Sequence, residues 1–146
     1  MKRDILIEGV KTMSNVSKGR GYVYSIQYHV VWCVKYRHKV LKGDIDADLR
    51  YILQRVADDN GFQIIELNTN EDHVHLLLDC KPQHYIPNMI KALKGVSGRY
   101  LMQAHGAELR KKLWGGHIWN PSYFIATVSE NTEAQVREYI QNQQQR

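Results

Sequence analysis

Two histidines stand one residue apart inside an aliphatic run, "HVHLLL", which begins at His73. Alternate side chains of a β-strand point to opposite faces, so His73 and His75 share one face while Val74 and Leu76 share the other. Two imidazoles on one rigid strand provide half of a metal site or a pair of proton carriers. Two polar residues on the solvated face of a half-buried sheet would give the same pattern. The pair alone does not decide among these interpretations.

The C-terminal segment "VREYIQNQ" (136–143) carries a second set of candidate residues. Its residues 136, 139, 140 and 143 fall on one helical face, which predicts an amphipathic helix that packs this face inward. Gln143 puts a carboxamide where the pattern asks for an apolar group, and an amide oxygen is an acceptable ligand for a hard divalent ion. Tyr139, one turn earlier, is either an oxygen nucleophile or an ordinary half-buried aromatic. With the two histidines, Gln143 could complete a three-ligand metal site open to a substrate.

Basic residues cluster with aromatic residues in three segments, 32–39, 91–100 and 110–119. Lysine and arginine contact phosphates while aromatic rings stack on unpaired bases, which is how single strands are held. Any one cluster would equally fit a solvated surface, but three clusters around a possible metal site favour a nucleic-acid partner. The residues predicted to bind DNA are Lys35, Tyr36, Arg37, Lys91, Lys94, Arg99 and Trp119.

The composition is that of one globular domain: 146 residues, of which 43% are hydrophobic and 24% charged. The net charge of +5 leans toward a polyanionic partner. No apolar run is long enough to cross a bilayer, and residues 1–20 lack the hydrophobic centre of a signal peptide. We therefore expect a cytoplasmic protein with no membrane partner. Cys33 and Cys80 are expected to be reduced and to serve only in packing.

The order of predicted elements is β-α-β-β-α-β followed by a helix. Strands are expected at 22–34, 62–67, 73–80 and 123–129, and helices at 46–61, 86–104 and from Thr132, where Gln135 completes a possible capping box. The first of these helices should bury the apolar residues that recur at helical spacing, Leu49, Ile52, Leu53, Val56 and Ala57. This order predicts a ferredoxin-like α+β fold, in which helices cover one face of an antiparallel four-stranded sheet. Residues 1–20 are expected to form a loosely ordered arm. The long, uncharged strand at 22–34 is expected to be a sheet edge that a dimer covers.

Five segments in this order resemble a known family, the HUH single-tyrosine transposases (TnpA type) of small insertion sequences, to which REP-associated tyrosine transposases are related. The segments are "GRGYVYSIQYHVVWCVKYRHKVL" (19–41), "DHVHLLL" (72–78), "KALKG" (91–95), "LWGGHIWNPSYFIATVSEN" (113–131) and "YIQNQ" (139–143). The resemblance implies that residues 21–146 form the catalytic domain of an enzyme that excises and inserts single-stranded DNA. It also implies a homodimer that acts on hairpins near the element's ends.

The resemblance assigns roles residue by residue. His73 and His75 match the metal-binding pair, Gln143 the third ligand and Tyr139 the nucleophile, with Mg²⁺ or Mn²⁺ as the ion and a 5′-phosphotyrosine as the intermediate. Two alternatives stay open: a domesticated relative that processes host palindromes, and a non-catalytic module that binds hairpins. The presence of all four residues argues against the second alternative, because a binding module has no need of the tyrosine and the glutamine.

Overall fold

The computed structural model describes residues 17–19, 22–24, 26–128 and 132–143, with the side chains of residues 26–128 and 134–143. Four antiparallel strands form the main sheet in the order β4–β5–β3–β6. Their bounds are Gln27–Cys33 (β3), Gln63–Asn70 (β4), His73–Asp79 (β5) and Phe124–Thr127 (β6). A short 3₁₀ helix, Lys35–Arg37 (η2), follows β3, and the strands Ser17–Gly19 (β1) and Tyr22–Tyr24 (β2) pair as a separate hairpin.

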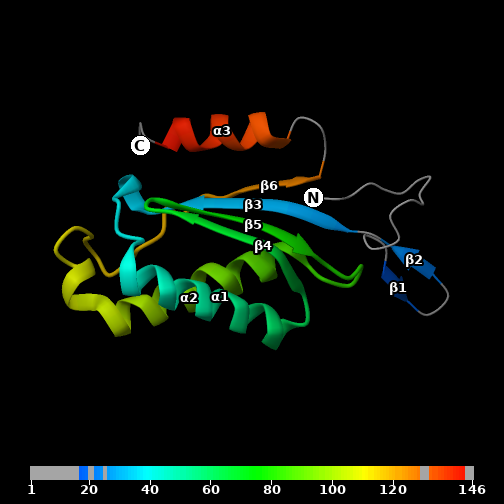
Figure 1. Ribbon diagram of the computed structural model, residues 1–146, viewed down its shortest axis with the longest axis horizontal. Coiled ribbons are helices and arrows are strands. Elements are labelled where there is room, and N and C mark those ends of the chain that lie inside the picture. The colour runs from blue at the N-terminus through cyan, green and yellow to red at the C-terminus, as the bar shows by residue number, and fades with distance from the viewer. Residues whose placement is uncertain (1–16, 20–21, 25, 129–131, 144–146) are drawn as a thin grey trace.

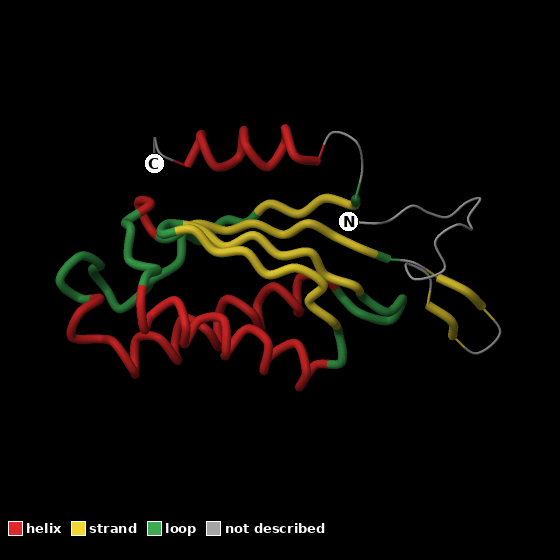
Figure 2. Tube along the Cα trace, viewed as in Figure 1, coloured by secondary structure: helices red, strands yellow, loops and turns green. Residues whose placement is uncertain are grey.

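The helices lie on both sides of this sheet (Figure 1). α1 (Gly43–Asn60) and α2 (Ile86–Leu109) cover one face, and α3 (Thr132–Gln143) lies over the opposite face. Figure 2 shows the same three layers, with α3 following the direction of the strands. The predicted ferredoxin-like α+β fold with an additional C-terminal helix is confirmed. Within the described residues, no helix combines the length and the apolarity that crossing a membrane requires.

The hydrophobic core lies between the sheet and the pair α1 and α2. Val30 and Trp32 of β3 meet Val74 and Leu76 of β5 there, and all four side chains are fully buried. The buried positions of α1 include every apolar residue that the helical spacing predicted for this face, namely Leu49, Ile52, Leu53, Val56 and Ala57. The helix ends at Gly61, whose φ of 78° is the left-handed conformation that glycine adopts without strain.

Two expectations about the strands and helices were wrong. The segment 22–34 is not one strand at a sheet edge, because Tyr22–Tyr24 pairs with β1 and β3 lies between β5 and β6. Alternation reveals which face a side chain takes but not how many neighbours a strand has, so it could not distinguish a central strand from an edge. α2 also runs five residues further than the predicted 86–104, past a break at His105, whose Nε2 lies 2.7 Å from Asp48 Oδ2 of α1.

The predicted N-terminal arm is described only in part. Residues 1–16 and 20–21 lie outside the described residues, while β1 lies within the segment expected to be loose. α3 begins at Thr132 as expected, but the side chain on which the predicted capping box depends is also outside the described part of the chain.

Candidate active site

The two β5 histidines face α3. Val74 and Leu76 point into the core on the side of α1 and α2, so the alternation of the strand turns His73 and His75 toward the opposite face. The prediction that both imidazoles share one face is confirmed. This face is covered rather than solvated, since Val31, paired with His75, is fully buried although it lies outside the main core.

His73 is held on both sides by hydrogen bonds. Its Nδ1 lies 2.8 Å from Asp72 Oδ1, and its Nε2 lies 2.8 Å from Asn70 Nδ2. If Nδ1–H donates to the carboxylate, Nε2 is the accepting nitrogen and is oriented to bind either the Asn70 amide or a cation. A carboxylate that orients a ring nitrogen in this way is the usual partner of a metal-binding histidine.

His75 contacts a third histidine, for which the sequence suggested no role. His75 Nε2 lies 2.9 Å from Nδ1 of His29, and the ring centroids are 5.1 Å apart. His29 lies on β3 and pairs with Leu77, two residues beyond His75 on the same face. The alternation of β3 placed His29 on this face, but only the strand register could show that it reaches His75.

Arg37 joins the histidine strand to the tyrosine helix. Its Nε and Nη2 donate to Asp72 Oδ2 at 3.0 and 2.8 Å, and its Nη1 donates to the carbonyl oxygen of Ile140 at 3.0 Å. Tyr36 and Arg37 both adopt positive φ, 56° and 53°, a conformation that costs non-glycine residues roughly 1–2 kcal/mol. Burial raises the pKa of Asp72, but hydrogen bonds from His73 and Arg37 outweigh burial and bring this pKa below its usual value.

The Tyr139 hydroxyl is hydrogen-bonded to Ser122. The two oxygens are 2.9 Å apart, and Ser122 Oγ also lies 2.9 Å from Asn120 Oδ1 and 3.5 Å from Gln143 Oε1. The latter two atoms are carbonyl oxygens that only accept, so Ser122 donates to one of them and Tyr139 is well placed to donate to Ser122. The tyrosine ring packs against Phe124, with 5.8 Å between centroids.

α3 presents the face that the helical spacing predicted. Val136 and Gln143 are buried, and Tyr139 and Ile140 are half-buried. Only 2% of Gln143 is exposed, so its amide points inward and close to Ser122. The structure therefore brings Tyr139 and Gln143 together around Ser122, while Arg37 connects the same turn of α3 to Asp72 and hence to His73.

The candidate ligands are two imidazoles and one carboxamide, donor groups that a divalent ion can accept. Among the described residues, no three histidine, cysteine, aspartate or glutamate side chains form a metal-binding group. A metal ion held by His73 and His75 would thus need a third ligand of another type, and the inward-facing amide of Gln143 is a candidate. The orientation of His73 by a carboxylate is consistent with that use.

The residues predicted to bind DNA lie in two places. Lys35 and Tyr36 are together in η2, where the Lys35 Nζ lies 5.8 Å from the centroid of the largely exposed Tyr36 ring. Arg37 in the same turn makes the contacts with Asp72 and Ile140 described above. Lys91, Lys94 and Arg99 lie on α2, with Lys91 and Arg99 exposed, and Trp119 lies opposite in the segment before β6. A role in DNA binding stays a prediction for all seven.

Lys94 has a structural role that sequence reasoning missed. Its Nζ donates to the carbonyl oxygens of Asn120 and Ser122 at 2.7 and 2.9 Å, which fixes the segment that carries the partner of Tyr139. Burial lowers the pKa of Lys94 to about 8, and only the nearby Cys33 opposes that shift. Asn120, Ser122 and Asp72 were also missed, because their roles depend on contacts with residues far away in the sequence.

Comparison with known proteins gives a consistent result. The family model "Transposase IS200 like" matches residues 22–143. The ISDra2 transposase TnpA of Deinococcus radiodurans is 53% identical over 128 residues, 88% of this chain and 91% of that protein. The transposase of insertion sequence element IS200 from Salmonella typhimurium is 29% identical over 120 residues, 82% of this chain and 78% of that protein.

Two solved structures share the fold. A crystal structure from Deinococcus radiodurans described as that of a transposase has a TM-score of 0.82 and 49% identity, and covers 87% of this chain and 97% of its own. A REP-associated tyrosine transposase bound to a REP hairpin has a TM-score of 0.55 and 15% identity, and covers 83% of this chain and 67% of its own. The family match spans the sheet, the histidine pair and the tyrosine helix, and the chain belongs to the family of IS200-like transposases.

Proposed function

We propose that this transposase cleaves and rejoins single-stranded DNA at hairpin-bearing ends, with Tyr139 as the nucleophile and a divalent ion held by His73, His75 and Gln143. The observation that carries the proposal is the connection between the two halves of the site. Arg37 contacts both the carboxylate that orients His73 and the helical turn that bears Tyr139. Such a connection would keep nucleophile and ligands in one constellation, and correct positioning is a large part of catalysis.

The proposed chemistry is a phosphoryl transfer to tyrosine. The Tyr139 oxygen attacks the scissile phosphorus and loses its proton, the bond from phosphorus to the 3′ oxygen breaks, and the departing oxygen becomes a 3′-hydroxyl. The DNA 5′-phosphate is then joined to Tyr139. A 3′-hydroxyl attacking that phosphotyrosine reverses the reaction, joins two strands and releases the phenol, so the bond energy is conserved without ATP.

Different residues of the chain would orient the nucleophile and the metal ligands. Ser122 orients the Tyr139 hydroxyl, and Asp72 and His29 orient His73 and His75. A divalent ion such as Mg²⁺ or Mn²⁺, when bound, would polarise a non-bridging oxygen of the scissile phosphate. An unperturbed tyrosine has a pKa of about 10, so the phenol is protonated and a weak nucleophile at neutral pH. Stabilising the negative charge on the oxygens of the attacked phosphate would therefore matter.

We further propose that the protein acts as a homodimer. The outer strands of the described sheet are β4 and β6, and large apolar side chains beside them, Ile65 and Tyr123, are 44% and 37% exposed. An outer strand with exposed apolar groups is a surface that a second copy can cover. β3, which was expected to be the edge that a dimer covers, lies inside the sheet and is not available for this pairing.

The substrate is tested by comparing strands. Each strand of a hairpin-bearing end and the annealed duplex are incubated separately with the protein and Mn²⁺, and covalent adducts are resolved on a denaturing gel. We expect an adduct with one single strand and none with the duplex. Equal reaction with all three substrates would contradict the proposed specificity for single strands.

A further inference from the structure

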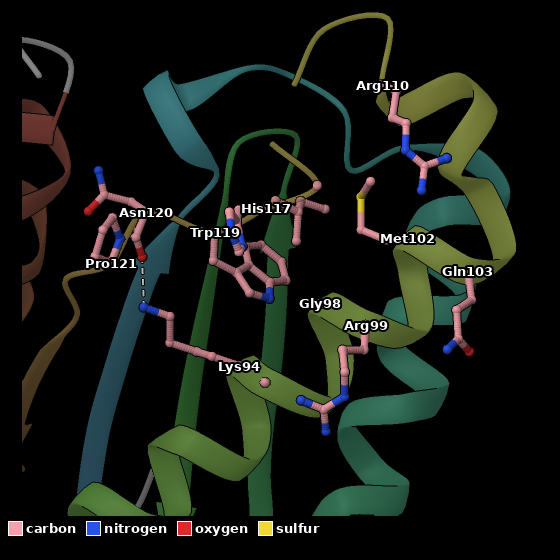
Figure 3. Close-up of a pocket in the computed structure, with 13 residues that line it drawn as sticks. Lys94, Gly98, Arg99, Met102, Gln103, Arg110, His117, Trp119, Asn120 and Pro121 are labelled. Carbon is pink, nitrogen blue, oxygen red and sulfur yellow. Dashed lines mark hydrogen bonds between the residues drawn. The ribbon is translucent and has the colours of Figure 1, made fainter. Parts of the chain in front are cut away.

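A cavity of about 590 Å³ opens between α2 and the segment 116–121 (Figure 3). Neither His73 nor His75 lines it. Its lining combines cationic and aromatic side chains: Lys94, Arg99 and Arg110 together with His117 and Trp119. In Figure 3, Arg99 projects from α2 and Arg110 from just beyond that helix, while His117 and Trp119 lie on the facing segment. The volume is within the range of roughly 300–1,000 Å³ that small ligands occupy.

Two glycines of α2 make room for the arginines of this cavity. A β-carbon built on Gly95 would lie 3.5 Å from Nη1 of Arg99, and one built on Gly106 would lie 2.5 Å from Nη1 of Arg110. Each arginine is four residues after its glycine, so both guanidinium groups lie back along the helix over a position without a side chain. Glycine in a helix interior costs about 1 kcal/mol relative to alanine, and this use of the space offsets that cost.

A third glycine lets the aromatic wall approach the helix. A β-carbon on Gly98 would lie 3.4 Å from the Trp119 ring, and the indole Nε1 donates to Ser97 Oγ at 3.1 Å. The facing segment turns back toward α2 through Gly115 and Gly116, whose φ values of 73° and 71° would be strained in other residues. Gly95 and Gly98 thus border this cavity, and Gly106 leaves room for Arg110, which also lines it.

We infer that this cavity receives one unpaired base of the DNA strand, with His117 and Trp119 against that base and with Arg99 and Arg110, which lie about three helical turns apart along α2, on different phosphates of the strand. Guanidinium groups pair with phosphate oxygens in a two-point geometry, and a base that leaves its stack is commonly received by aromatic and apolar side chains. A base inside a duplex is stacked on both sides and cannot leave its stack to enter a cavity, so the site would select single strands or unpaired tails.

The cavity is connected to the nucleophile. Asn120 lines it, Asn120 Oδ1 accepts a hydrogen bond from Ser122 at 2.9 Å, and Ser122 in turn contacts the Tyr139 hydroxyl at 2.9 Å. Lys94 fixes the carbonyl groups of both Asn120 and Ser122. A nucleotide held here would therefore fix the position of the DNA strand relative to Tyr139. This inference rests on the proposed single-stranded substrate.

The test compares two DNA probes that differ in an unpaired tail. A fluorescent DNA hairpin without an extension and the same hairpin with a tail of about ten nucleotides, within the usual site size of single-strand binders, are titrated with the full-length Tyr139→Phe variant in EDTA. Anisotropy then reports binding without cleavage. We expect the tailed hairpin to bind on the order of tenfold more tightly than the blunt one, as stacking of a base allows.

Two kinds of variant in this background test the positive charge and the open volume of the cavity. Arg99→Ala and Arg110→Ala should each remove most of the preference for the tail, and each should lower the slope of log affinity against log salt by about 0.7. Gly95→Leu adds an apolar side chain to the cavity wall and displaces the Arg99 guanidinium that lies over Gly95, so it should also abolish the preference. The matched controls are Arg55→Ala, an exposed arginine of α1, and Ala104→Leu, an exposed position of α2 outside the cavity. Both should behave like the parent protein.

The possible outcomes are distinct. Loss of the preference in the three cavity variants, with melting temperatures close to that of the parent, supports the inference. An unchanged preference, or an equal loss of affinity for tailed and blunt hairpins, overturns it. Wild-type protein that forms a covalent adduct yet shows no preference for the tail would overturn the cavity site alone. A preference for the tail without any adduct would overturn the proposed cleavage function alone.

Discussion

Arg37 donates two hydrogen bonds to a single oxygen of Asp72, at 3.0 and 2.8 Å, and leaves the other oxygen to His73. The Arg37 and Asp72 side chains are only 16% and 8% exposed, so this ion pair is well shielded from water. Arg37 also donates a third hydrogen bond, to the carbonyl oxygen of Ile140 in α3. One side chain therefore couples the orientation of a predicted metal ligand to the position of the predicted nucleophile.

Arg37→Met is expected to destabilise the protein by on the order of 3 kcal/mol, because it leaves the buried Asp72 carboxylate without its guanidinium partner. It should also slow adduct formation by at least tenfold while hairpin binding falls much less. Urea unfolding and adduct kinetics measure both. The control Arg55→Met breaks an exposed pair with Asp59 and should cost less than about 1 kcal/mol. Equal losses in the two variants would contradict the role given to Arg37.

The stability that Asp72 provides should depend on pH. Its pKa is lowered in the folded state from 3.8, so its contribution is complete above that value and is lost as the pH falls below it. The difference in unfolding free energy between wild type and Arg37→Met should therefore shrink as the pH is lowered from 5 toward the folded pKa. A difference that stays constant over this interval would show that the ion pair does not stabilise the fold.

Ser122→Ala removes one hydrogen-bond partner of the Tyr139 hydroxyl and leaves the ring packed on Phe124. We expect a loss of about 1 kcal/mol of stability and an adduct rate reduced by less than about tenfold, since the nucleophile itself remains. Ser122→Thr, which keeps a hydroxyl, should restore most of the rate. An adduct rate that is the same in all three proteins would remove Ser122 from the site.

Substitutions of the three predicted metal ligands should reduce activity to different extents. His73→Ala and His75→Ala are expected to abolish Mn²⁺-supported cleavage, and Gln143→Ala to weaken it less, because a neutral amide is the poorest of these ligands. Calorimetric titration with Mn²⁺ should show the same order in affinity. Excess EDTA should abolish cleavage by the wild type, and added Mn²⁺ should restore this activity. Full activity in EDTA would mean that the histidines do not hold a catalytic ion.

Both cysteines should be unreactive in the native protein. Burial raises the pKa of Cys33 to about 11 and that of Cys80 to about 12, so both are protonated thiols at neutral pH. Ellman's reagent should label them slowly at pH 7.5 and completely in denaturant. Because the unfolded chain releases these protons at lower pH than the folded one, both thiols should also reduce stability progressively above about pH 9. Rapid labelling of the native protein would place a thiol at the surface.

The proposed dimer can be tested by mixing inactive subunits. Light scattering should give the mass of two chains at micromolar concentration. Cleavage restored by mixing Tyr139→Phe with His75→Ala would mean that tyrosine and histidines come from different subunits, whereas the absence of restoration would mean that each site is built within one chain. A monomeric mass together with full activity would contradict the dimer.

The sequence was most informative where a residue's role depends on its own element. The spacing of Leu49, Leu53 and Val56 predicted the buried face of α1, and alternation predicted that His73 and His75 share a face. Gln143 was proposed as a ligand because its amide occupies a position where the helical pattern expects a buried apolar group, and the residue is indeed buried. Such patterns are local, so they can be recognised before the fold is known.

The remaining features depend on pairing between distant segments. His29 meets His75 only because β3 and β5 are antiparallel neighbours in one register, and 46 residues separate the two histidines. Ser122 and Lys94 acquire their roles when the segment before β6 lies between α2 and α3. Arg37 was predicted to contact DNA because it lies in a basic run, and its contacts with Asp72 and Ile140 arise from the tertiary structure alone.

The most direct test of the account is to identify the residue that becomes joined to DNA. Wild-type protein is incubated with the reactive single strand and Mn²⁺, the adduct is digested with protease and nuclease, and the modified peptide is sequenced by mass spectrometry. We expect the phosphodeoxynucleotide on Tyr139, attached through its 5′-phosphate, and no adduct from Tyr139→Phe, which should still bind the hairpin. Modification of another residue such as Tyr123, or an undiminished adduct from Tyr139→Phe, would contradict the account.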